Sequence, residues 1–296
     1  MMRILGTIFA GLLGLAFGSF LNVCLSRWPE GESVVRPRSH CRQCGRTLAW
    51  WENVPLVSWL AMRGRCRTCH AWIGWRYPLV EFAIGALWAC AASQALPRIL
   101  YPYQFELFPH AHIIDFFESL LLYWLLVGLA TLDAEHLWIP DRITLPAIAL
   151  VSLNYVCPFF WVWNAHITNN DISTNAAWYV AEYLLGILAA AGLILLIRWV
   201  YWLIRRREGI GLGDAKLMAL LAAWLGLPGA LLAFGIGIML GALAAVVVLV
   251  VPSGRRGSES WAASKLPLGT FLCIGGIVSS LWGQPILAAY LRWAGF

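Results

Sequence analysis

The sequence predicts an all-α polytopic membrane protein with about eight transmembrane helices and one small loop domain outside the bilayer. Three observations support this fold class: 60% of the 296 residues are hydrophobic, only 12% are charged, and the mean hydropathy is +0.71. Soluble globular domains are about 45–50% apolar and about 25% charged. A composition this apolar excludes an ordinary soluble domain and indicates an integral membrane protein.

Apolar residues are gathered in eight segments. They cover residues 4–25, 78–97, 113–132, 143–163, 177–203, 215–227, 229–252 and 268–290. The first segment is long enough to span a bilayer and lacks a convincing small-residue cleavage site, so we expect a retained helix. The sixth is short for a span, and Leu227-Pro228-Gly229 separates it from the seventh. It is expected to be a tilted or half-buried helix.

The basic residues predict the orientation of these segments. When eight spans alternate, all of the 21 Lys and Arg residues except Arg3, Arg98 and Arg292 fall on one side. Loops rich in Lys and Arg stay in the cytoplasm, so we expect that side to be cytoplasmic and both termini to lie outside. The formal net charge of +6 then reflects orientation in a lipid bilayer, and we expect no nucleic-acid partner.

Residues 26–77 form the only sizeable segment outside the predicted spans, and they contain two C-x-x-C pairs. The four cysteines are Cys41, Cys44, Cys66 and Cys69. This spacing suits a tetrahedral zinc site with four thiolate ligands, and a short loop gains stability from such a metal. Two disulfides are the alternative, but the predicted cytoplasmic side is reducing. Four thiolates leave no open position, so we expect a structural zinc rather than a catalytic one.

Three aspartates lie at the predicted cytoplasmic ends of spans. Asp133 ends the third span, Asp141 begins the fourth after Pro140, and Asp214 begins the sixth. Ionisable residues in membrane segments are costly and therefore indicate function. Asp133 and Asp214 are expected at the same depth on the same side, where helix packing can bring them together.

Paired carboxylates are the requirement of aspartic protease chemistry. Two like charges a few ångströms apart cannot both ionise, so the pair shares one proton and activates a water molecule. Gly211 and Gly213 precede Asp214 and leave room for a peptide backbone. From the residues alone, Asp214 also fits a helix N-cap, and the acids also fit a metal site or the proton relay of an ion-coupled membrane transporter. A membrane-anchored zinc-binding interaction module would need the loop but not the acids.

Several of these motifs resemble those of the bacterial type IV prepilin peptidases, the bifunctional leader peptidase/N-methyltransferases. The resemblance covers nearly the whole chain. It rests on "GSFLNVCLSRWPEGESVVRPRSHCRQCG", "NVPLVSWLAMRGRCRTCHAWIGWRYPLVE", "DAEHLWIPD" and "GIGLGDAKLMALLAAWLG". The last is similar to the Gly-x-Gly-Asp motif of intramembrane aspartic proteases. One departure is visible in "KLPLGTFLCIGG", where Leu268 and Thr270 stand in place of a frequent Phe and Pro.

The resemblance implies an enzyme of the bacterial inner membrane with its active site near the cytoplasmic face. It implies cleavage of prepilin or pseudopilin leaders by Asp133 and Asp214, then N-methylation of the new N-terminus with S-adenosylmethionine as methyl donor. Other residues of the same motifs are expected to be auxiliary, namely Asp141, Gly211, Gly213 and Lys216. Glu81 and Gly85 are candidates for binding the methyl donor, because they lie in a methylation-linked segment. An ordinary span with one buried acid is the alternative for these two residues.

The expected domain organisation follows from these assignments. Residues 1–25 form the first transmembrane helix, and residues 26–77 form a cytoplasmic four-cysteine zinc-binding domain linked to methylation. Residues 78–296 form the transmembrane aspartic peptidase domain.

Overall fold

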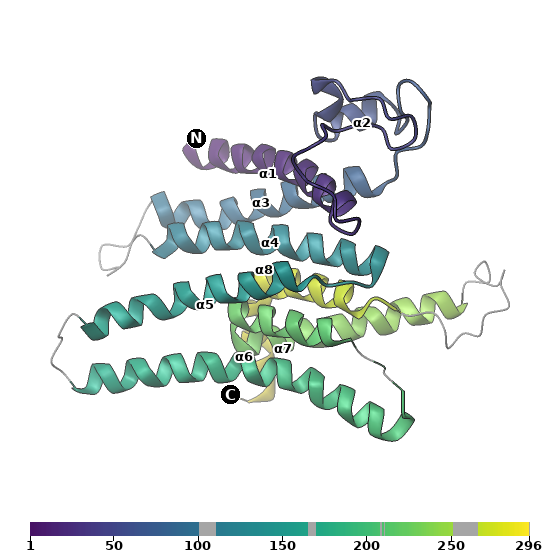
Figure 1. Ribbon diagram of the computed structural model, residues 1–296. Helices are drawn as coiled ribbons and strands as arrows, with labels where there is room; N and C mark the ends of the chain where they lie inside the picture. Colours follow the sequence, from purple (N-terminus) through teal and green to yellow (C-terminus); the bar gives the residue numbers. More distant parts are fainter. Residues whose placement is uncertain (101–110, 165–169, 208, 210, 251–265, 296) are drawn as a thin grey trace. The chain divides into compact units, whose positions relative to one another are not determined.

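The structure is a computed structural model that describes residues 1–100, 111–164, 170–207, 209, 211–250 and 266–295. Within these residues the chain is helical, with two isolated antiparallel bridges and no β-sheet. The α-helices, labelled in Figure 1, are α1 (Met2–Arg27), α2 (Val57–Ala61), α3 (Arg76–Leu100), α4 (Ala111–His136), α5 (Asp141–Asn164), α6 (Asn170–Arg205), α7 (Leu212–Val250) and α8 (Leu268–Ala294). A short 3-10 helix, η1 (Trp50–Asn53), precedes α2. The predicted all-α fold class is confirmed.

Six helices of the described residues are long and apolar enough to cross a membrane: α1, α3, α4, α6, α7 and α8. The chain is therefore a multi-pass membrane protein. The predicted sixth and seventh segments lie in one element, α7, which is interrupted at Gly226 with φ 69° and ψ 170°. Pro228 cannot donate its backbone nitrogen and its ring crowds the preceding turn, which accounts for a break just before it. The basic residues Arg255, Arg256 and Lys265 lie outside the described residues.

The chain divides into two compact units, Met1–Gly128 and Leu129–Phe296, and the boundary falls within α4. The first unit contains α1, α3, the first part of α4 and the loop between α1 and α3. The second contains the last part of α4 and helices α5 to α8. Both cysteine pairs lie in the first unit, and Asp133, Asp141 and Asp214 lie in the second.

Small residues let helices approach closely in the first unit. A Cβ on Gly18 of α1 would lie 2.7 Å from the Cα of Glu81, and one on Gly14 would lie 2.9 Å from the carbonyl oxygen of Ile84. Lipid offers little hydrophobic drive for helix association, so glycine contacts of this kind supply the packing in membrane proteins. This crossing brings Glu81 of α3 against the backbone of α1.

The second unit uses the same device between α7 and α8. A Cβ on Gly237 of α7 would lie 3.2 Å from the backbone of Phe271 and Leu272 in α8. The hydroxyl of Ser279 donates to the carbonyl oxygen of Gly229 at 2.8 Å, and Ser279 is only 6% exposed. These contacts position the start of α8 in the part of the unit that carries the aspartates.

Candidate functional site

The four cysteines of the loop form one cluster. Their Sγ atoms all lie within 4.8 Å of one another, and the Sγ atoms of Cys41 and Cys69 are 3.7 Å apart. Tetrahedral zinc with Zn–S bonds of about 2.3 Å separates its sulfur ligands by about 3.8 Å, whereas a disulfide bond is about 2.05 Å long. All four thiols are free. The spacing therefore matches a metal site and not a pair of disulfides.

Each C-x-x-C pair folds into the same tight turn. The carbonyl oxygen of Cys41 accepts a hydrogen bond from the N–H of Gly45 at 2.8 Å, and that of Cys66 accepts one from His70 at 3.0 Å. The residue after the second cysteine is left-handed in both turns, with φ 70° at Gly45 and φ 55° at His70. Glycine adopts this conformation without strain. The repeated turn presents one pair of thiols from each half of the loop to the same point.

The electrostatics of Cys66 suit a metal ligand. Its side chain is buried, and the backbone N–H groups of Cys69 and Thr68 donate to its sulfur, which lowers the pKa of the Cys66 thiol to about 6. A thiol must lose its proton to bind a metal. The backbone therefore stabilises the thiolate form that a zinc ion requires.

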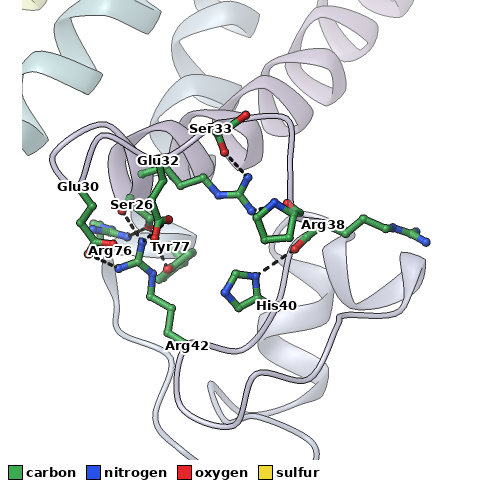
Figure 2. Close-up of polar contacts among 11 residues, drawn as sticks. Ser26, Glu30, Glu32, Ser33, Arg38, His40, Arg42, Arg76 and Tyr77 are labelled. Atoms are coloured by element: carbon green, nitrogen blue, oxygen red, sulfur yellow. Dashed lines mark hydrogen bonds and ion pairs between the residues drawn. The ribbon is translucent and has the colours of Figure 1, made fainter.

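Arginines anchor the loop to the helices of the first unit. Arg76 Nη2 donates to Ser26 Oγ at 2.6 Å, Arg42 donates to the carbonyl oxygen of Ser26, and Arg42 Nη1 pairs with Glu30 at 2.7 Å (Figure 2). Arg27 is 5% exposed and donates to the carbonyl oxygens of Ser33 and Pro37, both at 2.7 Å. The loop is thus tied to the last turn of α1, and that turn is joined to the first turn of α3.

An ion pair between a buried carboxylate and a half-buried arginine inside the loop was not anticipated. Glu52 is 4% exposed, its Oε1 accepts from Arg46 Nη2 at 2.7 Å, and its Oε2 accepts from the N–H of Ala49 at 2.8 Å. The pair joins η1 to the first cysteine turn. The three-residue spacing from Ala49 to Glu52 matches the glutamate half of a capping box, and that signal could have revealed it.

Glu81 and Gly85, the candidates for binding a methyl donor, have different surroundings. Glu81 is 7% exposed, and its Oε2 accepts from the N–H of Leu56 at 2.8 Å. Gly85 packs against α1, where a Cβ would meet Leu15 Cδ2 at 2.6 Å. The carboxylate of Glu81 is held at the junction of α1, α3 and the loop, whereas Gly85 lies within the helix contact.

Asp133 and Asp214 are both buried, at 6% and 8% exposed, and their carboxyl groups interact electrostatically. Asp133 comes from the last turn of α4 and Asp214 from the first turn of α7. Asp214 is the third residue of α7 rather than its N-cap, and its Oδ2 accepts from the N–H of Gly211 at 3.2 Å. The second unit therefore brings together the two acids that the sequence singled out.

Thr270 is a partner of Asp133 that sequence reasoning did not assign. Its N–H donates to Asp133 Oδ2 at 2.7 Å, and its hydroxyl lies 3.2 Å from the same oxygen. The hydroxyl also donates to the carbonyl oxygen of Ala130 at 2.9 Å. The departure of Thr270 from the frequent proline was the available signal, because a proline has no N–H to donate.

The auxiliary residues lie around the acids. Lys216 Nζ pairs with Asp141 Oδ1 at 2.5 Å, which links the first turns of α7 and α5. Gly213 is helical, and a Cβ there would lie 3.2 Å from Ile139 Cβ. A Cβ on Gly211 would make only an ordinary contact, 3.6 Å from Asp214 Oδ2. Gly213 thus serves close packing against the α4–α5 connection, and its backbone angles do not require glycine.

Comparison with known proteins identifies the chain's relatives. The model of the bacterial peptidase A24 N-terminal domain matches residues 12–95, and that of the type IV leader peptidase family matches residues 120–246. A prepilin leader peptidase/N-methyltransferase of Pseudomonas aeruginosa is 33% identical, over 96% of this chain and 93% of that protein. One of Myxococcus xanthus is 36% identical, over 88% of this chain and 68% of that protein. The chain belongs to the type IV leader peptidase family.

Members of the type IV leader peptidase family are aspartic peptidases, so the chain is an enzyme, and the transporter alternative is not supported. The N-terminal match covers both cysteine pairs and Glu81, and the second match covers Asp133 and Asp214. No solved structure matches the chain.

We expect the full-length protein to contain about one zinc ion per chain. Cys44→Ser removes one of the four ligands and should reduce the zinc content to near zero, measured by inductively coupled plasma mass spectrometry. Cys157→Ser is the matched control, because Cys157 lies in α5 of the other unit. Equal zinc in the two variants would contradict a four-cysteine site.

The Glu52–Arg46 pair predicts a pH dependence of the loop. Arg46, and after it the N–H of Ala49, hold the pKa of Glu52 below its ordinary value. A carboxyl group with a lowered folded-state pKa stabilises the fold above its unfolded pKa of about 4.3, and that contribution is lost as the pH falls through the folded pKa. We expect Glu52→Gln to lose roughly tenfold hydrogen-exchange protection at neutral pH.

The measurement compares protection factors for the η1 segment in both proteins between about pH 3 and pH 7. Zinc release at acid pH affects both proteins, so the difference between them isolates the carboxyl group. A difference that stays constant across the range would contradict the prediction.

Proposed function

We propose that this enzyme cleaves the leader peptides of type IV prepilins or pseudopilins with Asp133 and Asp214 as catalytic acids. The observation that carries the proposal is the electrostatic interaction of two buried carboxyl groups at helix ends of one compact unit. The relatives named prepilin leader peptidase/N-methyltransferase support the same substrate class. Membership of an aspartic peptidase family supports the same chemistry.

The geometry suits general acid–base catalysis. Two neighbouring carboxyl groups share one proton, so one can take a proton from water while the other donates a hydrogen bond to the scissile carbonyl. The two groups titrate as a pair, and the macroscopic pKa values belong to the pair. The attack of water on the peptide carbonyl then needs no metal-bound nucleophile, and the shared proton passes to the departing amine.

Neighbouring residues are proposed to hold the pair in place. Thr270 fixes one oxygen of Asp133 through its N–H and its hydroxyl, and Gly211 fixes one oxygen of Asp214. The Lys216–Asp141 pair holds the starts of α5 and α7 together two residues away from Asp214. Fixed carboxyl groups lower the cost of reaching the reactive arrangement.

We propose the bacterial inner membrane as the location, with the loop and the acids on the cytoplasmic side. The basic residues near both support this orientation under the positive-inside rule. A prepilin has a basic leader in water and an apolar helix in the bilayer, so its scissile bond lies at the membrane boundary. Acids at the end of α4 and at the start of α7 would meet such a bond there.

We propose that the new N-terminus is then methylated with S-adenosylmethionine as methyl donor. The name of the relatives supports this second activity. Glu81 is the residue of this chain that we propose to face the donor, because it is a buried carboxylate whose hydrogen bonds among the described residues come from neutral groups, the N–H of Leu56 and the side chain of Ser19. When bound, the donor supplies an electrophilic methyl group. Structural zinc on Cys41, Cys44, Cys66 and Cys69 would hold the loop.

Substitution of either acid tests the peptidase. An asparagine side chain cannot share a proton with the remaining carboxyl group. We therefore expect Asp133→Asn and Asp214→Asn each to lose leader cleavage by at least about 10³-fold. The assay follows a purified prepilin in detergent micelles by the mobility shift that accompanies loss of the leader. Asp141→Asn leaves both acids in place and should cost less. Near-full activity of either dyad variant would rule out the proposed pair.

Substitution of Thr270 tests the proposed support of Asp133. Thr270→Val removes the hydroxyl and keeps the N–H, so we expect roughly a tenfold fall in kcat with KM little changed. Thr270→Ser keeps the hydroxyl and should therefore retain activity. Ser279→Ala is the matched control, because it removes a hydrogen bond of the same helix pair that does not involve an acid. Equal effects of Thr270→Val and Ser279→Ala would indicate a general packing role.

A further inference from the structure

A cavity of about 360 Å³ lies in the first unit, where the cysteine loop meets the last turns of α1 and the first turns of α3. Its volume falls within the range of about 300–1,000 Å³ that small-molecule sites occupy. Cys41 and Cys66, one from each cysteine turn, are among its lining residues, and so is Glu81. The loop that the proposed metal would hold therefore forms one wall of the cavity.

The helix side of the cavity carries an acceptor that lacks a donor. Asn22 is 2% exposed, and its Nδ2 donates to the carbonyl oxygen of Tyr77 at 3.0 Å, which fixes the orientation of the amide. Its Oδ1 is buried and has no hydrogen-bond partner among the described residues. Glu81 presents a buried carboxylate to the same cavity. A buried acceptor without a donor costs about 1–3 kcal/mol, so a ligand with N–H groups or positive charge is favoured here.

The loop side carries a donor that lacks an acceptor. Arg46 lines the cavity, its Nη2 is held by Glu52, its guanidinium also interacts with the Cys66 sulfur, and its Nε is buried without a partner among the described residues. Trp59, Trp72 and Tyr77 add aromatic surface to the lining. The cavity thus offers acceptors from the helices and an arginine donor from the loop. Aromatic rings from both the loop and α3 complete its lining.

We propose that this cavity binds S-adenosylmethionine, a proposal that rests on the methyltransferase activity proposed above. The ammonium group of the donor would meet Asn22 Oδ1 and Glu81, its carboxylate would meet Arg46, and its purine would lie against the aromatic rings. In the transfer, the amine nitrogen forms a bond to the methyl carbon as the carbon–sulfur bond breaks. The electron pair returns to sulfur, and the amine loses one proton to water.

The donor fits the cavity better than the peptide that accepts the methyl group. A peptide N-terminus offers an ammonium group to Asn22 and Glu81 but no carboxylate to Arg46. The amino-acid end of the donor satisfies both sides. The lining is also drawn mainly from the polar loop and from helix ends, where a water-soluble ligand has access.

Direct binding tests the assignment without requiring turnover. The probe is S-adenosylhomocysteine, measured by equilibrium dialysis against the full-length protein in detergent. Glu81→Gln keeps an acceptor for the Leu56 N–H and removes the charge, and Asn22→Leu removes the free oxygen. We expect each to weaken binding at least tenfold, with a zinc content equal to that of the wild type showing that the loop is still folded. Glu182→Gln, an exposed carboxylate of α6, is the matched control and should bind as the wild type does.

A second measurement does not depend on any variant. Ultraviolet cross-linking of radiolabelled S-adenosylmethionine to the wild type should label peptides that contain residues lining the cavity. Labelling confined to other peptides, or equal affinity of wild type, Glu81→Gln and Asn22→Leu, overturns the cavity assignment and leaves the methyltransferase proposal standing. A wild-type protein that neither binds the probe nor methylates cleaved prepilin overturns both.

Discussion

Every buried carboxylate in the described residues accepts a hydrogen bond from a backbone N–H at the start of a helix. The four pairs of acceptor and donor are Asp133 with Thr270, Asp214 with Gly211, Glu81 with Leu56, and Glu52 with Ala49. The first N–H groups of a helix have no partner within it, and the helix dipole favours negative charge there. The chain has 15 acidic residues in a mostly apolar sequence. The unpaired N–H groups at the starts of its helices offset the cost of burying four of these carboxylates.

This constraint makes the functional groups depend on helix packing. The N–H of Thr270 reaches Asp133 only because α8 begins beside the end of α4, and α8 is held by its small-residue contact with α7. Glu81 reaches Leu56 because Gly18 lets α3 approach α1. Glycines far from any reacting atom therefore set the position of the carboxyl groups. The packing position of Gly85 in the α1–α3 contact fits this pattern.

The sequence predicted what depends on spacing and composition. The cysteine cluster followed from two C-x-x-C pairs, because each pair forms its own local turn and only the meeting of the turns is long-range. The helices followed from long apolar runs. The break in α7 was expected at residues 227–229, next to its observed place at Gly226, because Pro228 disrupts the turn before it.

Contacts that join distant segments were beyond the same reasoning. The bond from Thr270 to Asp133 spans 137 residues, and that from Asn22 to Tyr77 spans 55. Neither has a local sequence pattern, because the partners meet only through the register of packed helices. The Glu52–Arg46 pair is different, since its six-residue span and the capping-box spacing made it accessible to sequence reasoning.

The proposed metal site and the pair of aspartates lie in different units of the chain. Cys41 and Cys66 line the cavity of the first unit, so a bound metal and a bound ligand would stabilise the same wall. Binding to a folded state stabilises that state in proportion to affinity and concentration. The aspartates and their donors all lie in the second unit. Loss of metal would therefore act first on the wall of the cavity, and the carboxyl pair would keep its own hydrogen bonds.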